Sequence, residues 1–91
     1  MKLELGDIFP IYDETFMVVE KATFMDNNYI LVNKLDEEGE PINELFIYKT
    51  TENGVMLVTD KKLLDVLMPI LSNKLQRDIN EINNENKYNI N

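Results

Sequence analysis

The chain has no histidine, no cysteine and no tryptophan, and its 91 residues include only three glycines and three prolines. Histidine is the usual proton carrier near neutral pH, and cysteine and histidine are common nucleophiles and metal ligands. Most catalytic centres therefore cannot be assembled from this sequence, and neither a disulfide nor a zinc-thiolate site can form. We expect a protein that is not an enzyme and that uses no cofactor and no metal.

Positive charge is also scarce, because 17 acidic residues face 9 basic ones and the net charge is −8. Residues 1–60 carry 13 acidic and 4 basic side chains, whereas residues 61–91 carry 4 and 5. A field of this sign repels phosphate backbones and anionic lipids. We expect no direct binding to nucleic acid or membranes. The acidity serves either solubility alone or contact with a basic protein surface.

A targeting or membrane-spanning segment is not apparent. The first residues include acids where a secretory signal needs a cationic flank and an apolar run. No apolar run approaches the roughly 20 residues that cross a bilayer. The sequence predicts a cytoplasmic protein with one domain over residues 1–83 and a polar, frayed tail over residues 84–91.

The first 59 residues alternate between apolar runs and turn residues, which predicts an antiparallel meander of four to five strands. The expected strands cover residues 3–12, 15–25, 29–35, 44–50 and 55–59. Turns are expected at Asp26-Asn27-Asn28 and Asn53-Gly54, since such residues tolerate positive φ. Pro10 favours an edge position for the first strand because it lacks a backbone donor.

After Thr59 the apolar period changes to that of a helix, so the fold class is α+β with a C-terminal helix packed on the sheet. Leucines 63, 64, 67 and 71 fall at helical spacings. Pro69 removes a hydrogen bond and collides with the carbonyl of Asp65, which predicts a kink or break there. A second helical segment is expected over residues 70–83.

Apolar residues occur on both predicted faces of the sheet. One face is expected to hold Phe16, Val18, Ala22, Phe24, Leu31 and Leu35. The other is expected to hold Met17, Val19, Met25, Ile30 and Val32. A solvated face should alternate to polar residues. One helix covers one face, so the other requires the second helical segment, a second copy in a homodimer, or a partner. The expected core residues are Phe16, Val18, Phe24, Leu31, Leu63, Leu67 and Leu71.

The one dense charge cluster is the loop from Asp36 to Glu40. It lacks the alternate spacing of an EF-hand, so a solvated turn or a docking patch fits better than a cation site. Together with the second sheet face it supplies the candidate partner-binding residues. These are Asp36, Glu37, Glu38, Glu40, Glu44, Met17, Val19, Met25, Ile30 and Val32.

Four segments form a pattern of apolar alternation and turns, namely the run from Phe16 to Phe24, the run from Asp26 to Val32, and the segments 44–49 and 55–58. On these segments, residues 15–72 resemble the YrzB-like family of small acidic bacterial domains of unknown function. It implies a bacterial protein with a sheet followed by an acidic helix, and it implies no activity.

These observations predict a non-enzymatic protein-interaction module that binds a basic protein surface or a second copy of itself. A phage or mobile-element inhibitor that mimics nucleic-acid charge is the alternative, motivated by small size and net acidity. A hydrolase that uses paired carboxylates is a third, less favoured class.

Overall fold

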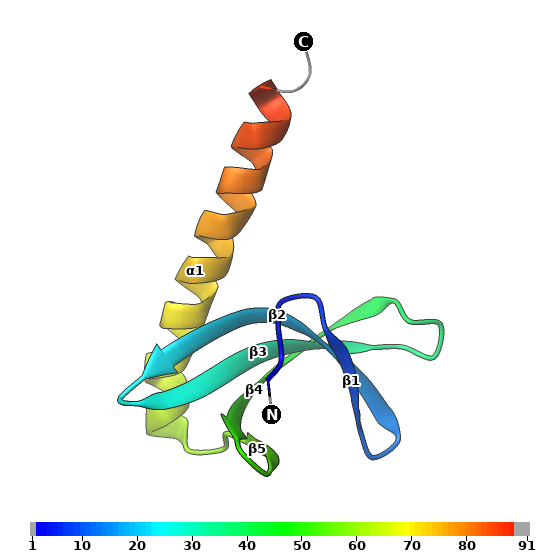
Figure 1. Cartoon of the computed structure of the whole chain (residues 1–91), viewed down its shortest axis with the longest axis vertical. Helices are drawn as coiled ribbons and strands as arrows, with labels where there is room; N and C mark the ends of the chain where they lie inside the picture. The colour runs from blue at the N-terminus through cyan, green and yellow to red at the C-terminus, as the bar shows by residue number, and fades with distance from the viewer. Residues whose placement is uncertain (1, 89–91) are drawn as a thin grey trace.

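A computed structural model describes the backbone of residues 2–88 and the side chains of residues 2–82. Five strands form one antiparallel sheet in sequential order, and one helix follows (Figure 1). The predicted α+β class and strand meander are confirmed. The elements are β1 Ile8–Ile11, β2 Glu14–Phe24, β3 Asn27–Leu35, β4 Pro41–Thr51, β5 Gly54–Leu57 and α1 Lys61–Tyr88.

Both predicted hairpin turns exist, but each lies one or two residues earlier than expected. The β2–β3 turn consists of Met25 and Asp26, whose φ angles are 49° and 64°. Two consecutive positive φ values match the right-handed twist of the flanking strands. In the β4–β5 hairpin, Glu52 and Asn53 form the turn, and Gly54 pairs with Thr51.

A β-bulge in β2 reverses the predicted assignment of residues to the two faces. Val18 pairs with Val32 while Glu20 pairs with Leu31, so Val19 has no partner on β3. One extra residue moves every later side chain of the strand to the opposite face. The expectation that Phe16, Val18, Ala22 and Phe24 share one face is therefore wrong.

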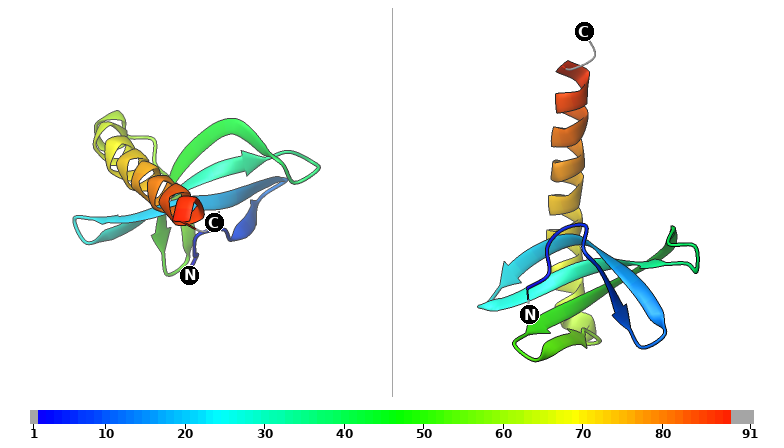
Figure 2. Two further views of the ribbon diagram at one scale, coloured as in Figure 1. Left: turned by 90° about the horizontal axis from the view of Figure 1, so that it is seen from above. Right: turned by 45° about the vertical axis from the view of Figure 1, so that its right-hand side comes forward.

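The sheet is curled (Figure 2), and one core lies on its concave side. The strand residues there are nearly inaccessible, and the partly buried side chains of Leu3 and Phe9 pack against them. The buried residues of this core are Phe16, Val18, Ile30, Val32 and Tyr48. The curled sheet and the N-terminal segment thus cover this face within one chain, and its apolar residues do not by themselves require a second copy.

The convex side forms a second core beneath α1. Tyr29, Leu31 and Ile47 of the sheet meet Leu67 and Leu71 of the helix. Five of the seven predicted core residues are buried, namely Phe16, Val18, Leu31, Leu67 and Leu71. Phe24 and Leu63 lie only at the margin of this second core.

Helix α1 runs without interruption through Pro69, so the predicted break and separate second segment are wrong. Pro69 and Asp65 are both exposed, which lets water satisfy the carbonyl that proline leaves without a donor. The helix is assigned through Tyr88, past the predicted domain boundary at residue 83. Its C-terminal half projects away from the sheet (Figure 1), and residues 89–91 lie outside the described part.

Candidate protein-binding surfaces

The acidic β3–β4 loop is a structured turn that its own first carboxylate holds in place. Oδ1 of Asp36 accepts hydrogen bonds from the backbone N–H groups of Glu38 and Glu40, each at 2.9 Å. The backbone N–H of Asp36 also donates to the carbonyl of Glu40 at 2.8 Å. The side chains of Glu37, Glu38 and Glu40 are exposed, so this loop presents three carboxylates to solvent.

Glu44 does not extend that acidic patch as an independent charge. Nζ of Lys34 lies 3.7 Å from Glu44 and 2.8 Å from Glu14. The hydrogen bond from Lys34 to Glu14 raises the pKa of the lysine. Glu44 therefore belongs to a cross-strand ion-pair group, which offsets part of its charge.

The predicted apolar binding face does not exist as one surface. Ile30 and Val32 are 2% and 0% exposed in the concave core, where no partner reaches them. Val19 packs under α1, and Met17 is half-buried. Met25 alone is well exposed, at the tip of the β2–β3 turn. The bulge that redistributes β2 between the two faces separates these residues.

Sequence reasoning missed a polar cluster at the free edge of β2, formed by Glu20, Lys74 and Asp78. Glu20 is 1% exposed, and its Oε1 accepts the backbone N–H of Lys21 at 3.0 Å. Nζ of Lys74 donates to the carbonyl of Lys21 at 2.7 Å and lies 3.8 Å from Oε1 of Glu20. The two side chains thus satisfy the backbone N–H and C=O of Lys21 at the sheet edge, as a neighbouring strand would.

This environment disfavours the charged form of Glu20. Burial raises the pKa of its carboxyl group, the backbone N–H of Lys21 lowers it, and Asp78 raises it further. Its Oε2 has no hydrogen-bond partner among the described residues. The sequence did not indicate Glu20 as a site residue, because simple alternation places its side chain on the same face as Phe16 and Val18. The bulge after Val18 instead turns Glu20 toward the helix.

A hollow of about 370 Å³ lies between the N-terminal segment and the ends of β2, β3 and β4. Lys2, Lys21 and Lys74 contribute to its wall. Lys21 is 3.2 Å from Glu4, and Lys74 is bound at the β2 edge as described above. Two of the three lysines of this wall are therefore already engaged by groups of the chain itself.

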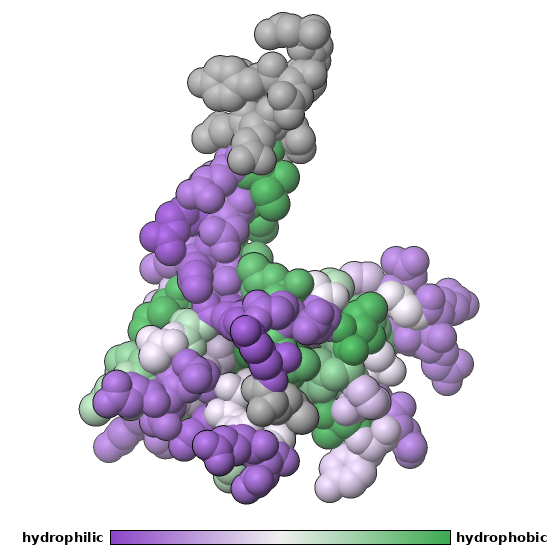
Figure 3. Space-filling model, viewed as in Figure 1, coloured by the Kyte–Doolittle hydropathy of each residue, from purple (hydrophilic) through white to green (hydrophobic). Residues whose placement is uncertain are grey.

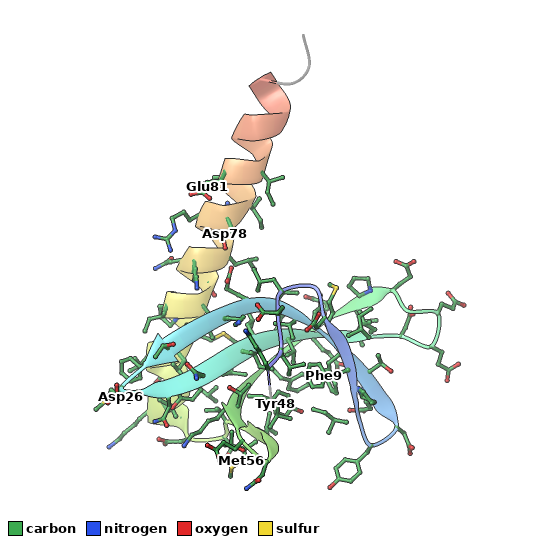
Figure 4. The ribbon with its side chains drawn as sticks, in the orientation of Figure 1. Phe9, Asp26, Tyr48, Met56, Asp78 and Glu81 are labelled. Atoms are coloured by element: carbon green, nitrogen blue, oxygen red, sulfur yellow. The ribbon has the colours of Figure 1, made fainter. Side chains whose placement is uncertain are left out.

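A larger groove of about 540 Å³ lies between the β1–β2 hairpin and β5, where the curled sheet stays open. Its lining residues are Ile11, Tyr12, Asp13, Glu14, Tyr48, Val55 and Leu57. Burial raises the pKa of Tyr48, and the nearby charge of Glu14 adds to this effect. Tyr48 extends into the concave side, with Met56 near the end of β5 (Figure 4).

The projecting part of α1 continues the apolar stripe that packs on the sheet. Within residues 61–82 of the helix, Leu75 is the last residue that contacts the second core. Ile79 and Ile82 follow it at spacings of four and three residues, and they are 42% and 55% exposed. Hydrophobic atoms line the side of the helix that faces over the sheet, while the outer side is hydrophilic (Figure 3).

No family model, curated protein or solved structure matches this chain. The resemblance of residues 15–72 to the YrzB-like family stays a prediction. Within residues 2–82, no group of three or more acidic side chains is placed to hold a metal ion. No helix in the described part of the chain has the length and apolar character needed to cross a membrane.

Proposed function

We propose that this protein is a non-enzymatic protein-binding module of the bacterial cytoplasm. The observation that carries the proposal is the apolar stripe of α1, which continues past the sheet into solvent. Ile79 and Ile82 are exposed and are not among the side chains that pack on the core beneath α1. Aliphatic side chains at spacings of three and four residues on an exposed helix are the usual anchors of helix-mediated recognition.

Two partner types fit this stripe. A second copy of the chain would pack its own stripe against it in a homodimer, and a different protein would offer an apolar groove or helix. The acidity of residues 1–60 favours a partner with basic flanks, because complementary charge accelerates association and selects against wrong partners.

Site-specific photocrosslinking in a native bacterial lysate tests the proposal. A photoreactive residue in place of Ile82 is expected to give discrete protein adducts, whose mass identifies either a dimer or a distinct partner. The matched control is the exposed Asn73, nine residues earlier and therefore on the opposite side of the helix. Equal adducts from both positions, or none from position 82, would contradict the proposal.

The loop braced by Asp36 favours a second candidate, an inhibitor that mimics nucleic-acid charge. Glu37, Glu38 and Glu40 present exposed carboxylates on an ordered turn. Such an inhibitor would bind a nucleic-acid enzyme with an affinity that falls steeply with salt. Replacing all three with lysine should abolish the binding, whereas Glu52→Lys in the β4–β5 turn should have little effect. Binding that is insensitive to salt would exclude this candidate.

A further inference from the structure

The outer edge of β5 offers two residues with unpaired backbone groups. The backbone N–H of Val58 donates to the carbonyl of Ile47 at 2.9 Å, and Met56 pairs with Lys49. Residues directly opposite in an antiparallel ladder alternate between hydrogen-bonded and non-hydrogen-bonded pairs. Val55 and Leu57 are the alternate positions, so their N–H and C=O groups point away from β4.

The exposed edges of β1 and β2 are protected in ways that the edge of β5 is not. On β1, Pro10 removes a backbone donor. At the β2 edge, the side chains of Glu20 and Lys74 bind the backbone N–H and C=O of Lys21. Strand β5 contains neither a proline nor a charged residue, and Met56 and Leu57 are 62% and 48% exposed. Native edges of this kind are templates for another strand.

The side chains at these two positions line the groove beside the edge. Val55 and Leu57 form one wall with Tyr48 of β4, and the β1–β2 hairpin forms the other with Ile11 and Asp13. A strand added to β5 would place every second side chain in this groove. Its backbone would bond the edge, and its alternate side chains would meet an apolar surface with a carboxylate beside it.

We propose that the outer edge of β5 binds an extended segment of a partner protein by strand addition, with apolar and cationic side chains alternating on its groove face. The cation follows from Asp13 on the hairpin wall and from the acidity of residues 1–60. A second copy fits less well, because each copy has a net charge of −8 and would bring the same acidic hairpin. This inference goes beyond the proposed function, since it concerns a surface that α1 does not share.

A synthetic heptapeptide, Thr-Ile-Thr-Lys-Thr-Ile-Thr with blocked ends, is the probe. When it adds to β5, one face presents Ile, Lys and Ile to the groove, and the other presents threonine. Titration into the ¹⁵N-labelled full chain should shift the amide signals of Val55 and Leu57 and slow their hydrogen exchange. Signals of Ile79 and Ile82 should stay unchanged, which separates this site from the α1 stripe.

Matched peptides test the geometry. When the peptide adds antiparallel to β5, as the other strands of the sheet pair, its groove-facing residues also direct their backbone N–H groups at β5, so N-methylation of Ile and Lys should weaken binding at least tenfold. N-methylation of the alternate threonines should leave it within about twofold. Replacing the peptide lysine with glutamate, or Asp13→Asn in the protein, should each weaken binding several-fold and reduce its salt dependence.

Three outcomes overturn the proposal. The first is the absence of shifts at Val55 and Leu57 with millimolar peptide. The second is equal binding of the two N-methylated peptides, which would mean that the edge backbone is not used. The third is a concentration-dependent shift of these amides without peptide, which would show that a second copy occupies the edge. Crosslinking at position 82 probes the stripe on α1, so its failure would change none of these three outcomes at β5.

Discussion

At the residue scale, Glu20 has an environment that opposes its charge. It is buried, its Oε2 lacks a hydrogen-bond partner among the described residues, and Asp78 adds negative charge nearby. Lys74 offsets this only in part, at 3.8 Å. The carboxyl group is best satisfied when it carries a proton, because it can then donate toward Asp78.

The first prediction concerns the pH dependence that follows from Glu20. Burial raises the pKa of this carboxyl above its ordinary value of 4.5, so the folded state binds the proton more tightly than the unfolded state. The contribution of Glu20 to stability is therefore complete below pH 4.5 and is lost as the pH rises through the raised pKa. Urea unfolding from pH 4.5 to 8 should show the wild type losing stability relative to Glu20→Gln as the pH rises.

The control for this comparison is Glu52→Gln in the exposed β4–β5 turn, whose stability should follow that of the wild type across the same range. A constant difference between wild type and Glu20→Gln at every pH would mean that burial of Glu20 does not favour its protonated form.

The second prediction distinguishes two phenylalanines of β2 that simple alternation treats alike. Phe16 is 2% exposed and meets Phe46 and Tyr48 at ring-centroid distances of 5.9 and 6.0 Å. Phe16→Ala should cost about 3–5 kcal/mol of unfolding free energy, since it leaves a cavity in a closed core. Phe24→Ala should cost clearly less, because Phe24 lies at the margin of the core under α1. Urea denaturation of the two variants measures the difference, and equal losses would contradict the two-core arrangement.

At the scale of elements, local signals in the sequence predicted the strands, the turn regions and the helix. Apolar alternation marks β2 and β3, the turn chemistry near Asp26 and Asn53 marks two hairpins, and the spacing of Leu67 and Leu71 marks α1. These local signals did not predict which side chains of β2 lie on each face of the sheet. A bulge depends on how Val18 and Glu20 meet their partners on β3, which no periodicity within β2 records.

The candidate site was less predictable than the fold for the same reason. Exposure of the acidic loop follows from its composition, and Glu37, Glu38 and Glu40 are indeed exposed. The burial of Ile30 and Val32 depends on the curl of the whole sheet around Leu3 and Phe9. The edge cluster of Glu20 and Lys74 joins residues 54 positions apart, and only the docked helix brings them together.

The third prediction belongs to α1. Pro69 lies inside the helix, where it deprives the carbonyl of Asp65 of its intrahelical donor. Both residues are exposed, so Pro69→Ala restores a hydrogen bond without disturbing the core. Thermal unfolding followed by circular dichroism should show a gain of about 1–3 kcal/mol in unfolding free energy.

Ser72→Ala, at another exposed position of α1, is the control for helix propensity alone and should gain about 0.5 kcal/mol or less. A loss of stability in Pro69→Ala would show that the proline is needed for the docked position of the helix.

At the scale of the whole molecule, the chain divides into a folded body and a projecting helix end. The extents of 47, 34 and 23 Å describe an elongated molecule, with the helix lying over the sheet only in its first half. The two proposed binding surfaces lie on different parts of this shape. One is the edge of β5 beside the open groove, and the other is the stripe that ends in Ile79 and Ile82.

The fourth prediction follows from that division. Among the helix side chains that the structure describes, which end at Ile82, Leu75 and Asp78 are the last that interact with the body, whereas residues 79–82 are all exposed. A chain that ends after Asp78 should therefore keep its unfolding free energy within about 1 kcal/mol of the full chain. Leu71→Ala in the full chain should lose about 2–5 kcal/mol of unfolding free energy, because Leu71 is fully buried against the sheet.

The truncated chain should also retain peptide binding at β5, because α1 does not line that groove. If truncation instead unfolds the protein, residues 79–91 stabilise the body through contacts beyond those that the described part of the chain contains. Contacts with a second copy of the chain would be their most direct source.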